Sequence, residues 1–180
     1  GIPAAKGNRK KLIGTYTLLF AMLAGVMFLP FLITGKSLIW NVDGQPQYYP
    51  YLRYMGIWLR DALRNVFHGD LSVNLYDLRI GMGDDIGAVF RSHPLDLLSV
   101  LVPAEQTELL YNGLVILRLY LAGLCFLAFC RYWNRPDSAI LTGSLVYLSS
   151  GYVLRLGTQH PTFLTAMIML PLLLLGAEKV

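Results

Sequence analysis

A group of hydrogen-bonding side chains follows the first long apolar stretch of the chain. Asp43 precedes Gly44, which allows a turn with positive φ, and Gln45, Gln47 and Tyr48 come next. A carboxylate can accept a proton, and amide or phenol groups can hold the hydroxyls of a ligand. This stretch therefore predicts a site for a hydroxylated ligand. The structural alternative is that Asp43 caps a helix while the tyrosines form an interfacial aromatic belt.

Three basic residues farther along could pair with a negatively charged group. Arg118 lies inside an apolar segment, where a charge costs about 2.5–3.5 kcal/mol on insertion, so a structural partner or a ligand such as a lipid phosphate should compensate it. Arg155 and His160 lie in or near the polar turn "RLGTQHP". His160 could be a general base, a phosphate partner or a satisfied turn residue, and its place in a turn favours the last.

The segment "GMGDDIG", residues 81–87, holds the adjacent carboxylates Asp84 and Asp85. Two such groups on a glycine-flanked turn could bind a divalent cation, although an exposed acidic turn is the more common arrangement. No Lys follows the glycines, so the segment is not a phosphate-binding loop. The spacing of Cys125 and Cys130 suits neither a disulfide framework nor a metal site, and no Ser, His and Asp arrangement indicates a hydrolase.

The composition is that of a membrane protein. Hydrophobic residues make up 55% of the chain and charged residues 14%, against about 25% charged residues in an ordinary soluble domain. The net charge of +4 does not indicate a nucleic-acid partner, because the placement of Lys and Arg in a membrane chain sets its orientation. The expected surroundings are the lipid bilayer.

Four apolar segments are predicted to span the membrane. Residues 12–34 contain no charge and are long enough, as a helix, to cross a hydrocarbon core of about 30 Å. Residues 109–130, 139–156 and 163–177 are the others, and the third is short for a full crossing. The predicted fold is an all-α, polytopic transmembrane helix bundle.

Basic residues around these spans set the predicted orientation. Under the positive-inside rule, residues 1–11 and 131–138 lie in the cytoplasm, and residues 35–108 and 157–162 lie outside. The protein is thus expected in the cytoplasmic membrane with its N-terminus inside. The residues concerned are Lys6, Arg9, Lys10, Lys11, Arg131, Arg135 and Lys179.

The outer loop, residues 35–108, is too long to be a simple linker. Over about 50–67, apolar residues recur at helical spacing, and Arg53, Arg60 and Arg64 fall on the opposite side. This amphipathic helix could lie along the outer leaflet or pack on the transmembrane bundle, and the two are equally favoured. Residues 94–102 begin at Pro94 and end before Pro103, and this short apolar piece predicts a re-entrant or surface helix. The apolar positions are Leu52, Met55, Leu59, Ala62, Leu63 and Val66.

The order of these features resembles a known family. The chain has a basic start, one span, "DGQPQYYP" before an amphipathic helix, a glycine-rich patch, "SHPLDLLSVLVP", a span with a basic residue, and "YLSSGYV" leading to "HPTFLTAMIMLPLLLLG". It is similar to the amino-terminal part of the YfhO family of bacterial membrane proteins, which belongs with the GT-C glycosyltransferases. The resemblance covers most of residues 10–180 and implies a GT-C-like helix bundle.

The resemblance implies transfer of a sugar from a polyprenyl-phosphate donor to an acceptor on the outer face of the membrane. The implied acceptors are cell-envelope glycopolymers such as lipoteichoic acid or other lipid-linked molecules. Asp43 matches the family's acidic residue beyond the first span and would be the catalytic base. Gln45, Gln47 and Tyr48 would orient hydroxyls. Arg118, Arg155 and His160 would stabilise the leaving phosphate.

Two observations limit what the resemblance carries over. Relatives have a GLGGN-like patch where this chain has Asp84 and Asp85, so a metal role for these acids is not implied. GT-C enzymes have many more spans, so the chain is expected to be part of a larger multi-pass protein. One alternative is that this part is inactive alone, because the rest of the catalytic cavity lies in the other spans. The rival to an enzyme is a transporter of lipid-linked saccharides or an assembly scaffold.

Overall fold

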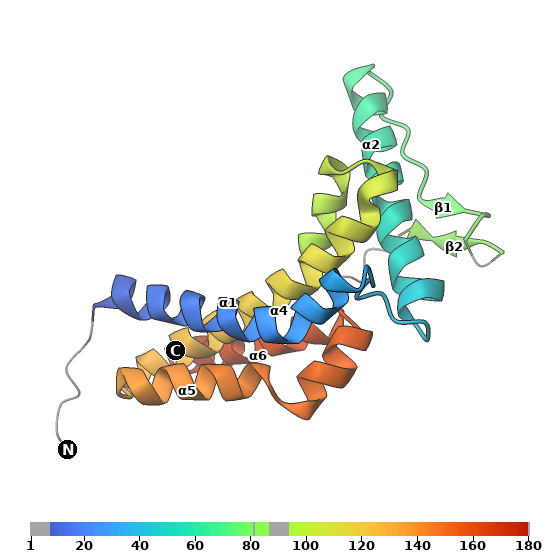
Figure 1. The fold of residues 1–180 in the computed structure, drawn as a ribbon. Coiled ribbons are helices and arrows are strands. Elements are labelled where there is room, and N and C mark those ends of the chain that lie inside the picture. The colour runs from blue at the N-terminus through green and yellow to red at the C-terminus, as the bar shows by residue number, and fades with distance from the viewer. Residues whose placement is uncertain (1–7, 81, 87–93, 180) are drawn as a thin grey trace. The chain divides into compact units, whose positions relative to one another are not determined.

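The computed structural model describes residues 8–80, 82–86 and 94–179, and these residues are mostly helical (Figure 1). The chain divides into two compact units. Unit 1 comprises Gly1–Leu38 and Val115–Val180, and unit 2 comprises Ile39–Leu114. The long helix α4 begins in unit 2 and continues in unit 1.

Unit 1 is built from apolar helices. They are α1 (Arg9–Ile33), most of α4 (Thr107–Tyr132), α5 (Asp137–Leu148), the π-helix η4 (Tyr152–Gly157) and α6 (Phe163–Ala177). Only α1 and Ala104–Tyr132, among the described residues, are long and apolar enough to cross a membrane. In α1, Leu18, Met22 and Val26 are 64%, 62% and 78% exposed. Such a face suits hydrocarbon surroundings, because soluble proteins rarely expose large apolar patches.

The third predicted span, residues 139–156, contains a shorter helix in the structure, whereas α6 has the bounds predicted for the fourth. The helix expected over 139–156 ends at Leu148, where Ser149 Oγ donates to the carbonyl of Leu145 at 2.9 Å. A serine side chain that bonds back to the preceding turn competes with helix continuation. The chain then re-enters helical geometry as η4, which has π-type turns. That residues 139–156 and 163–177 cross the membrane stays a prediction.

The core of unit 1 depends on a close approach at Gly123. Tyr16 of α1 is fully buried, and its hydroxyl donates to the carbonyl of Tyr120 at 2.8 Å. A Cβ at position 123 would clash with the Tyr16 hydroxyl and lie 2.7 Å from Leu148 Cδ1. Small residues let transmembrane helices approach in this way, since packing and interhelical hydrogen bonds hold them together. Gly123 therefore brings α1, α4 and α5 into contact.

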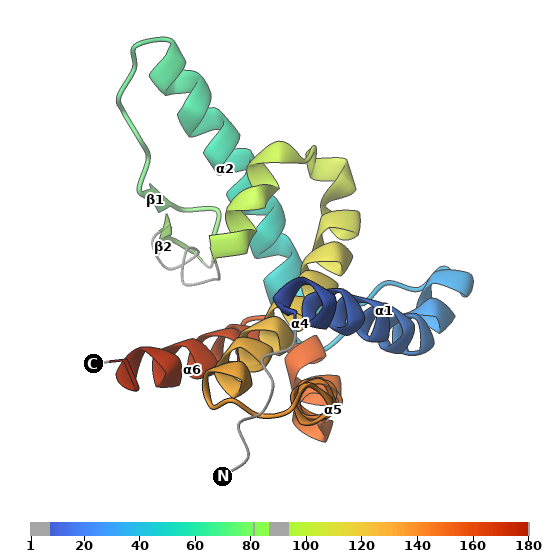
Figure 2. The same ribbon diagram turned by 90° about the vertical axis from the view of Figure 1, so that its left-hand side faces the viewer.

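Unit 2 forms around helix α2 (Tyr49–Phe67), which continues directly from the π-helix η1 (Gly44–Tyr48). Figure 2 shows α2 beside the short strands β1 (Tyr76–Asp77) and β2 (Asp84–Asp85), which pair antiparallel. The 3-10 helix η2 (Pro94–Leu101) packs against α2 so closely that a Cβ on Gly56 would lie 2.6 Å from the carbonyl oxygen of Ser99. The 3-10 helix η3 (Ala104–Gln106) then leads into α4.

The predicted basic stripe on α2 is wrong for Arg60. Its Nη1 donates to the carbonyls of Ser99 at 2.8 Å and Val102 at 2.5 Å. Arg53 Nε donates to the carbonyl of Ala104 at 3.4 Å, whereas Arg64 is exposed beside Asp61. A long arginine stem can reach around a helix flank. Arg60 therefore donates to carbonyls at the end of η2, where a helix leaves acceptors in excess; the Ser99 carbonyl also accepts from the amide of Val102 at 3.4 Å.

Among the described residues of unit 2, neighbours cover the first half of the apolar face of α2 more completely than the second. Leu52 and Met55 are buried, whereas Leu63 and Val66 are 48% and 47% exposed. The first half of the apolar face of α2 thus packs on η2. The sequence predicts that this face lies on the outer leaflet or on the transmembrane bundle, and packing on η2 is not among those alternatives.

We expect Gly123→Ala to destabilise unit 1 by about 1–3 kcal/mol, the usual cost of forcing an extra group into a well-packed core. Detergent-induced unfolding followed by circular dichroism measures the change. Gly113→Ala in the same helix is the matched control, because a Cβ there meets nothing within 4 Å. Equal stability of both variants would show that Gly123 does not limit the helix packing.

Candidate functional site

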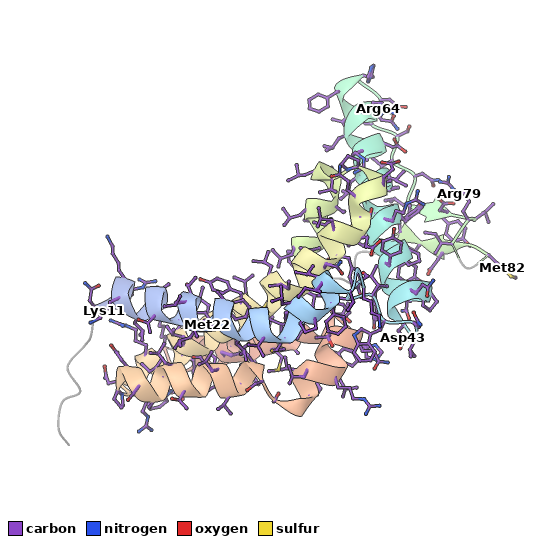
Figure 3. All side chains as sticks on the ribbon, in the orientation of Figure 1. Lys11, Met22, Asp43, Arg64, Arg79 and Met82 are labelled. Carbon is purple, nitrogen blue, oxygen red and sulfur yellow. The ribbon has the colours of Figure 1, made fainter. Side chains whose placement is uncertain are left out.

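The candidate base, Asp43, stands at the start of the π-helix η1. Its carbonyl accepts hydrogen bonds from the amides of Gln47 at 3.1 Å and Tyr48 at 3.0 Å. Its side chain is half-buried and makes no cap hydrogen bond to η1. The structure therefore gives no support to the alternative in which the Asp43 carboxylate caps the helix that follows. Figure 3 labels Asp43 at this end of unit 2.

Gly44 fixes the backbone that carries Asp43. Gly44 is buried, and a Cβ there would lie 3.3 Å from Ile39 and 3.5 Å from the Tyr111 hydroxyl. A side chain would press on Ile39, whereas its separation from the Tyr111 hydroxyl would be an ordinary van der Waals contact. Gly44 does not adopt the positive φ that its residue type allows. The amide of Gln45 also donates to the carbonyl of Trp40 at 2.8 Å. The turn that presents Asp43 is thus held on both sides by the residues of unit 2.

The structure keeps the other residues of this stretch on one π-helical segment. Gln45 and Gln47 are exposed, and Tyr48 is half-buried. The side-chain amides of Gln45 and Gln47 are therefore accessible to a ligand. Asp43 lies immediately before this segment in the chain. π-Helices are rare and occur frequently at functional sites.

The second polar turn also contains a π-helix. Arg155 is exposed in η4, and the amide of Thr158 donates to its carbonyl. His160 is half-buried, and its ring stacks on Phe163 with centroids 4.8 Å apart. Gly157 is buried, and a Cβ there would lie 2.5 Å from Leu164 Cδ2, so η4 packs closely against α6. Arg155 and His160 therefore belong to one structured turn of unit 1.

Arg118 is a buried charge within a candidate membrane span. The residue lies in α4 and is 3% exposed. Asp43, Gln45 and Gln47 belong to unit 2, whereas Arg118 belongs to unit 1 together with Arg155 and His160.

The acidic pair of residues 81–87 forms part of a small hairpin. In the register of β1 and β2, Asp84 pairs with Asp77 and Asp85 pairs with Tyr76. The side chain of Asp84 accepts a hydrogen bond from the amide of Asp85 at 2.8 Å. The described part of the chain contains no group of three or more potential metal ligands. Residues 81 and 87 lie outside the described residues.

A buried carboxylate that the sequence reading missed lies beside this hairpin. Asp77 is 5% exposed and accepts from Tyr54 Oη at 2.6 Å and from Arg79 Nη2 at 2.7 Å. These hydrogen bonds, those from Arg79 foremost, hold the pKa of Asp77 well below its usual range. Burial, with Asp77 as hydrogen-bond partner, raises the pKa of Tyr54 to about 12. The only sequence signal is the D-x-R spacing of 77 and 79.

Asp77 is therefore structural rather than a free base. Together with Trp58 Nε1, which donates to the carbonyl of Asn74 at 2.9 Å, it ties the segment after α2 back onto that helix. A carboxylate with this many donors has little affinity for a proton.

We expect Asp77→Asn to loosen the segment around residues 70–80, because Tyr54 and Arg79 lose a charged partner. Hydrogen exchange measured by mass spectrometry should show faster exchange there. Asp61→Asn is the control, since Asp61 makes only an exposed 3.6 Å ion pair with Arg64. Because the folded pKa of Asp77 is lowered, its stabilising effect is complete above about pH 4 and is lost as the pH falls through the folded value. Unchanged exchange would contradict the assignment.

Comparison with known proteins gives one match. A family model described as "Bacterial membrane protein YfhO" matches residues 15–180. No curated protein and no solved structure matches the chain. The match confirms the family resemblance drawn from the sequence, and it covers both units, including Asp43, Arg118, Arg155 and His160.

Proposed function

The chain belongs to the YfhO family of bacterial membrane proteins, and on this basis we propose that it is a membrane glycosyltransferase of the GT-C type. It moves a sugar from a polyprenyl-phosphate donor to a cell-envelope glycopolymer, such as lipoteichoic acid, or to another lipid-linked acceptor. The transfer takes place on the outer face of the cytoplasmic membrane.

The observation that carries the proposal is the turn from Asp43 to Tyr48. It places a half-buried carboxylate directly before a π-helix with two exposed amide side chains, Gln45 and Gln47. Gly44 holds this turn against Ile39 and Tyr111. A held carboxylate beside hydrogen-bonding groups is the arrangement that general-base catalysis on a hydroxyl group needs.

In the proposed reaction, Asp43 accepts the proton of the acceptor hydroxyl as the hydroxyl oxygen attacks the anomeric carbon of the donor sugar. The bond from that carbon to the phosphate oxygen breaks, and its electron pair leaves with the polyprenyl phosphate. Attack from the opposite face inverts the anomeric centre. Gln45, Gln47 and Tyr48 orient hydroxyl groups of the sugar or acceptor.

Cationic groups stabilise the charge that develops on the leaving phosphate. Arg118, Arg155 and His160 are assigned to this role on the chemistry of their side chains. Arg155 is the most accessible of the three, and Arg118 is buried. A divalent cation at Asp84 and Asp85 is not part of the proposal, because the described residues bring no third carboxylate, histidine or cysteine to this pair to complete a metal site.

We expect Asp43→Asn to lower the transfer rate by about 10²- to 10⁴-fold, the usual contribution of a general base. The assay uses the full-length protein in membranes supplied with a polyprenyl-linked radiolabelled sugar, and it measures label in the acceptor. Asp61→Asn, which removes an exposed carboxylate of the same unit, should retain full activity. Asp43→Glu should recover part of the rate, because it restores the base at a shifted position.

The competing function is transport of a lipid-linked saccharide. It is separated by following the donor in sealed vesicles, because a transporter moves labelled lipid across the membrane without consuming it. Full transfer by the Asp43→Asn protein would refute the catalytic assignment. Donor movement without product would favour the transporter.

A further inference from the structure

Unit 1 contains a cavity of about 490 Å³ at one end of its helices. Figure 1 shows the start of α1 and the end of α6 at this end, and α4 also finishes here. The lining includes Arg9 from the first turn of α1, Arg131 from the last turn of α4 and Lys179 just after α6. Three basic residues far apart in the sequence therefore meet at one cavity.

The rest of the lining is mainly apolar. Among the described residues that line the cavity, no carboxylate is present. The apolar lining comes from α1, α4 and α6, so the cavity combines three cationic side chains and the amide of Asn134 with a hydrocarbon wall. The apolar lining residues are Ile13, Leu124, Leu127, Ala128 and Leu175.

Helix electrostatics do not account for all three cations. Arg131 in the last turn of α4 is favourable to the helix dipole, as is a base after α6. Arg9 is different, because it lies in the first turn of α1, which contains no acidic residue. A cation at that end opposes the dipole. The positive-inside rule already accounts for a base at this end, and an anion bound outside the helix would offset the unfavourable interaction with the dipole.

Aromatic residues mark this end as the level of a membrane surface. Tyr132 lines the cavity, and its ring meets Trp133 edge to face with centroids 5.8 Å apart. Both are partly exposed, at 41% and 46%. Tyr and Trp concentrate where the hydrocarbon meets the headgroups. The Tyr132 hydroxyl also donates to the carbonyl of Glu178 at 3.0 Å and so holds the ends of α4 and α6 together.

We propose that this cavity binds one anionic phospholipid of the cytoplasmic leaflet. The lipid phosphate pairs with Arg9, Arg131 and Lys179, and an acyl chain lies along the apolar wall. Basic pockets between membrane helices recognise anionic headgroups in this way. A small inorganic anion would leave the apolar wall unused, and a zwitterionic lipid would bring an ammonium group toward the cations. The inference is independent of the proposed glycosyl transfer.

The test is native mass spectrometry of the full-length protein released from vesicles of phosphatidylglycerol or phosphatidylcholine with identical acyl chains. The wild-type protein should retain one phosphatidylglycerol in preference to phosphatidylcholine. Arg9→Gln, Arg131→Gln and Lys179→Gln should each weaken retention about fivefold, and together roughly a hundredfold.

The matched control is the triple variant Lys10→Gln, Lys11→Gln and Arg135→Gln. It removes the same number of positive charges, two from the start of α1 and one from the segment between α4 and α5. None of these three residues lines the cavity, and Figure 3 labels Lys11 at the start of α1. The control should keep the lipid. Equal loss in both triple variants would overturn the proposal in favour of general surface charge.

Two further measurements use the wild-type protein alone, so they do not depend on whether the variants fold. Added phosphatidylglycerol should raise the thermal unfolding temperature in detergent, because a ligand of the native state stabilises it, whereas phosphatidylcholine should not. Inorganic phosphate should not displace the retained lipid. Equal stabilisation by both lipids, or displacement by phosphate, would overturn the assignment to an anionic phospholipid.

Discussion

The constraint on which this structure depends is that backbone groups in apolar surroundings must find hydrogen-bond partners within the protein. In α1 the chain meets it with one helix from Arg9 to Ile33. The helix contains Pro30, whose own carbonyl accepts from the Thr34 hydroxyl at 2.8 Å. At two places in the chain the helical ladder is widened rather than broken. These are the π-helices η1 and η4, and they carry Gln45, Gln47, Tyr48 and Arg155 among the candidate site residues.

The same constraint explains unit 2 by another route. Its 3-10 helix η2 and the segment after α2 have backbone carbonyls that no regular ladder satisfies, and side chains of α2 reach them instead. Arg60 bonds the carbonyls of Ser99 and Val102, and Trp58 bonds that of Asn74. The amphipathic helix α2 thus supplies both an apolar face and the hydrogen-bond donors Arg60 and Trp58. Together they hold the segments of unit 2 that follow this helix.

The parts of the fold that follow from local pattern were predictable from the sequence. The uncharged run after Lys11 predicts a span, and α1 is long and apolar enough to be one. Hydropathy and periodicity report which face of a helix is apolar, but they do not report which distant carbonyl an arginine will reach. That is why Arg60 was assigned to a polar stripe and why Asp77 was missed. The sequence singles out the stretch that carries Asp43, but it does not indicate that the residues after Asp43 form a π-helix.

Charge placement links topology to recognition in unit 1. The positive-inside rule treats Arg9, Arg131 and Lys179 as equivalent to Lys10, Lys11 and Arg135, because it counts charges near span ends. The structure divides them, since only the first three line a cavity with an apolar wall. The orientation of the chain in the membrane depends only on the number of positive charges near the span ends. Lys10, Lys11 and Arg135 can supply these charges. A bound lipid needs convergence of three helix ends, held by the Tyr132 hydrogen bond to Glu178, so lipid recognition depends on folding in a way that orientation does not.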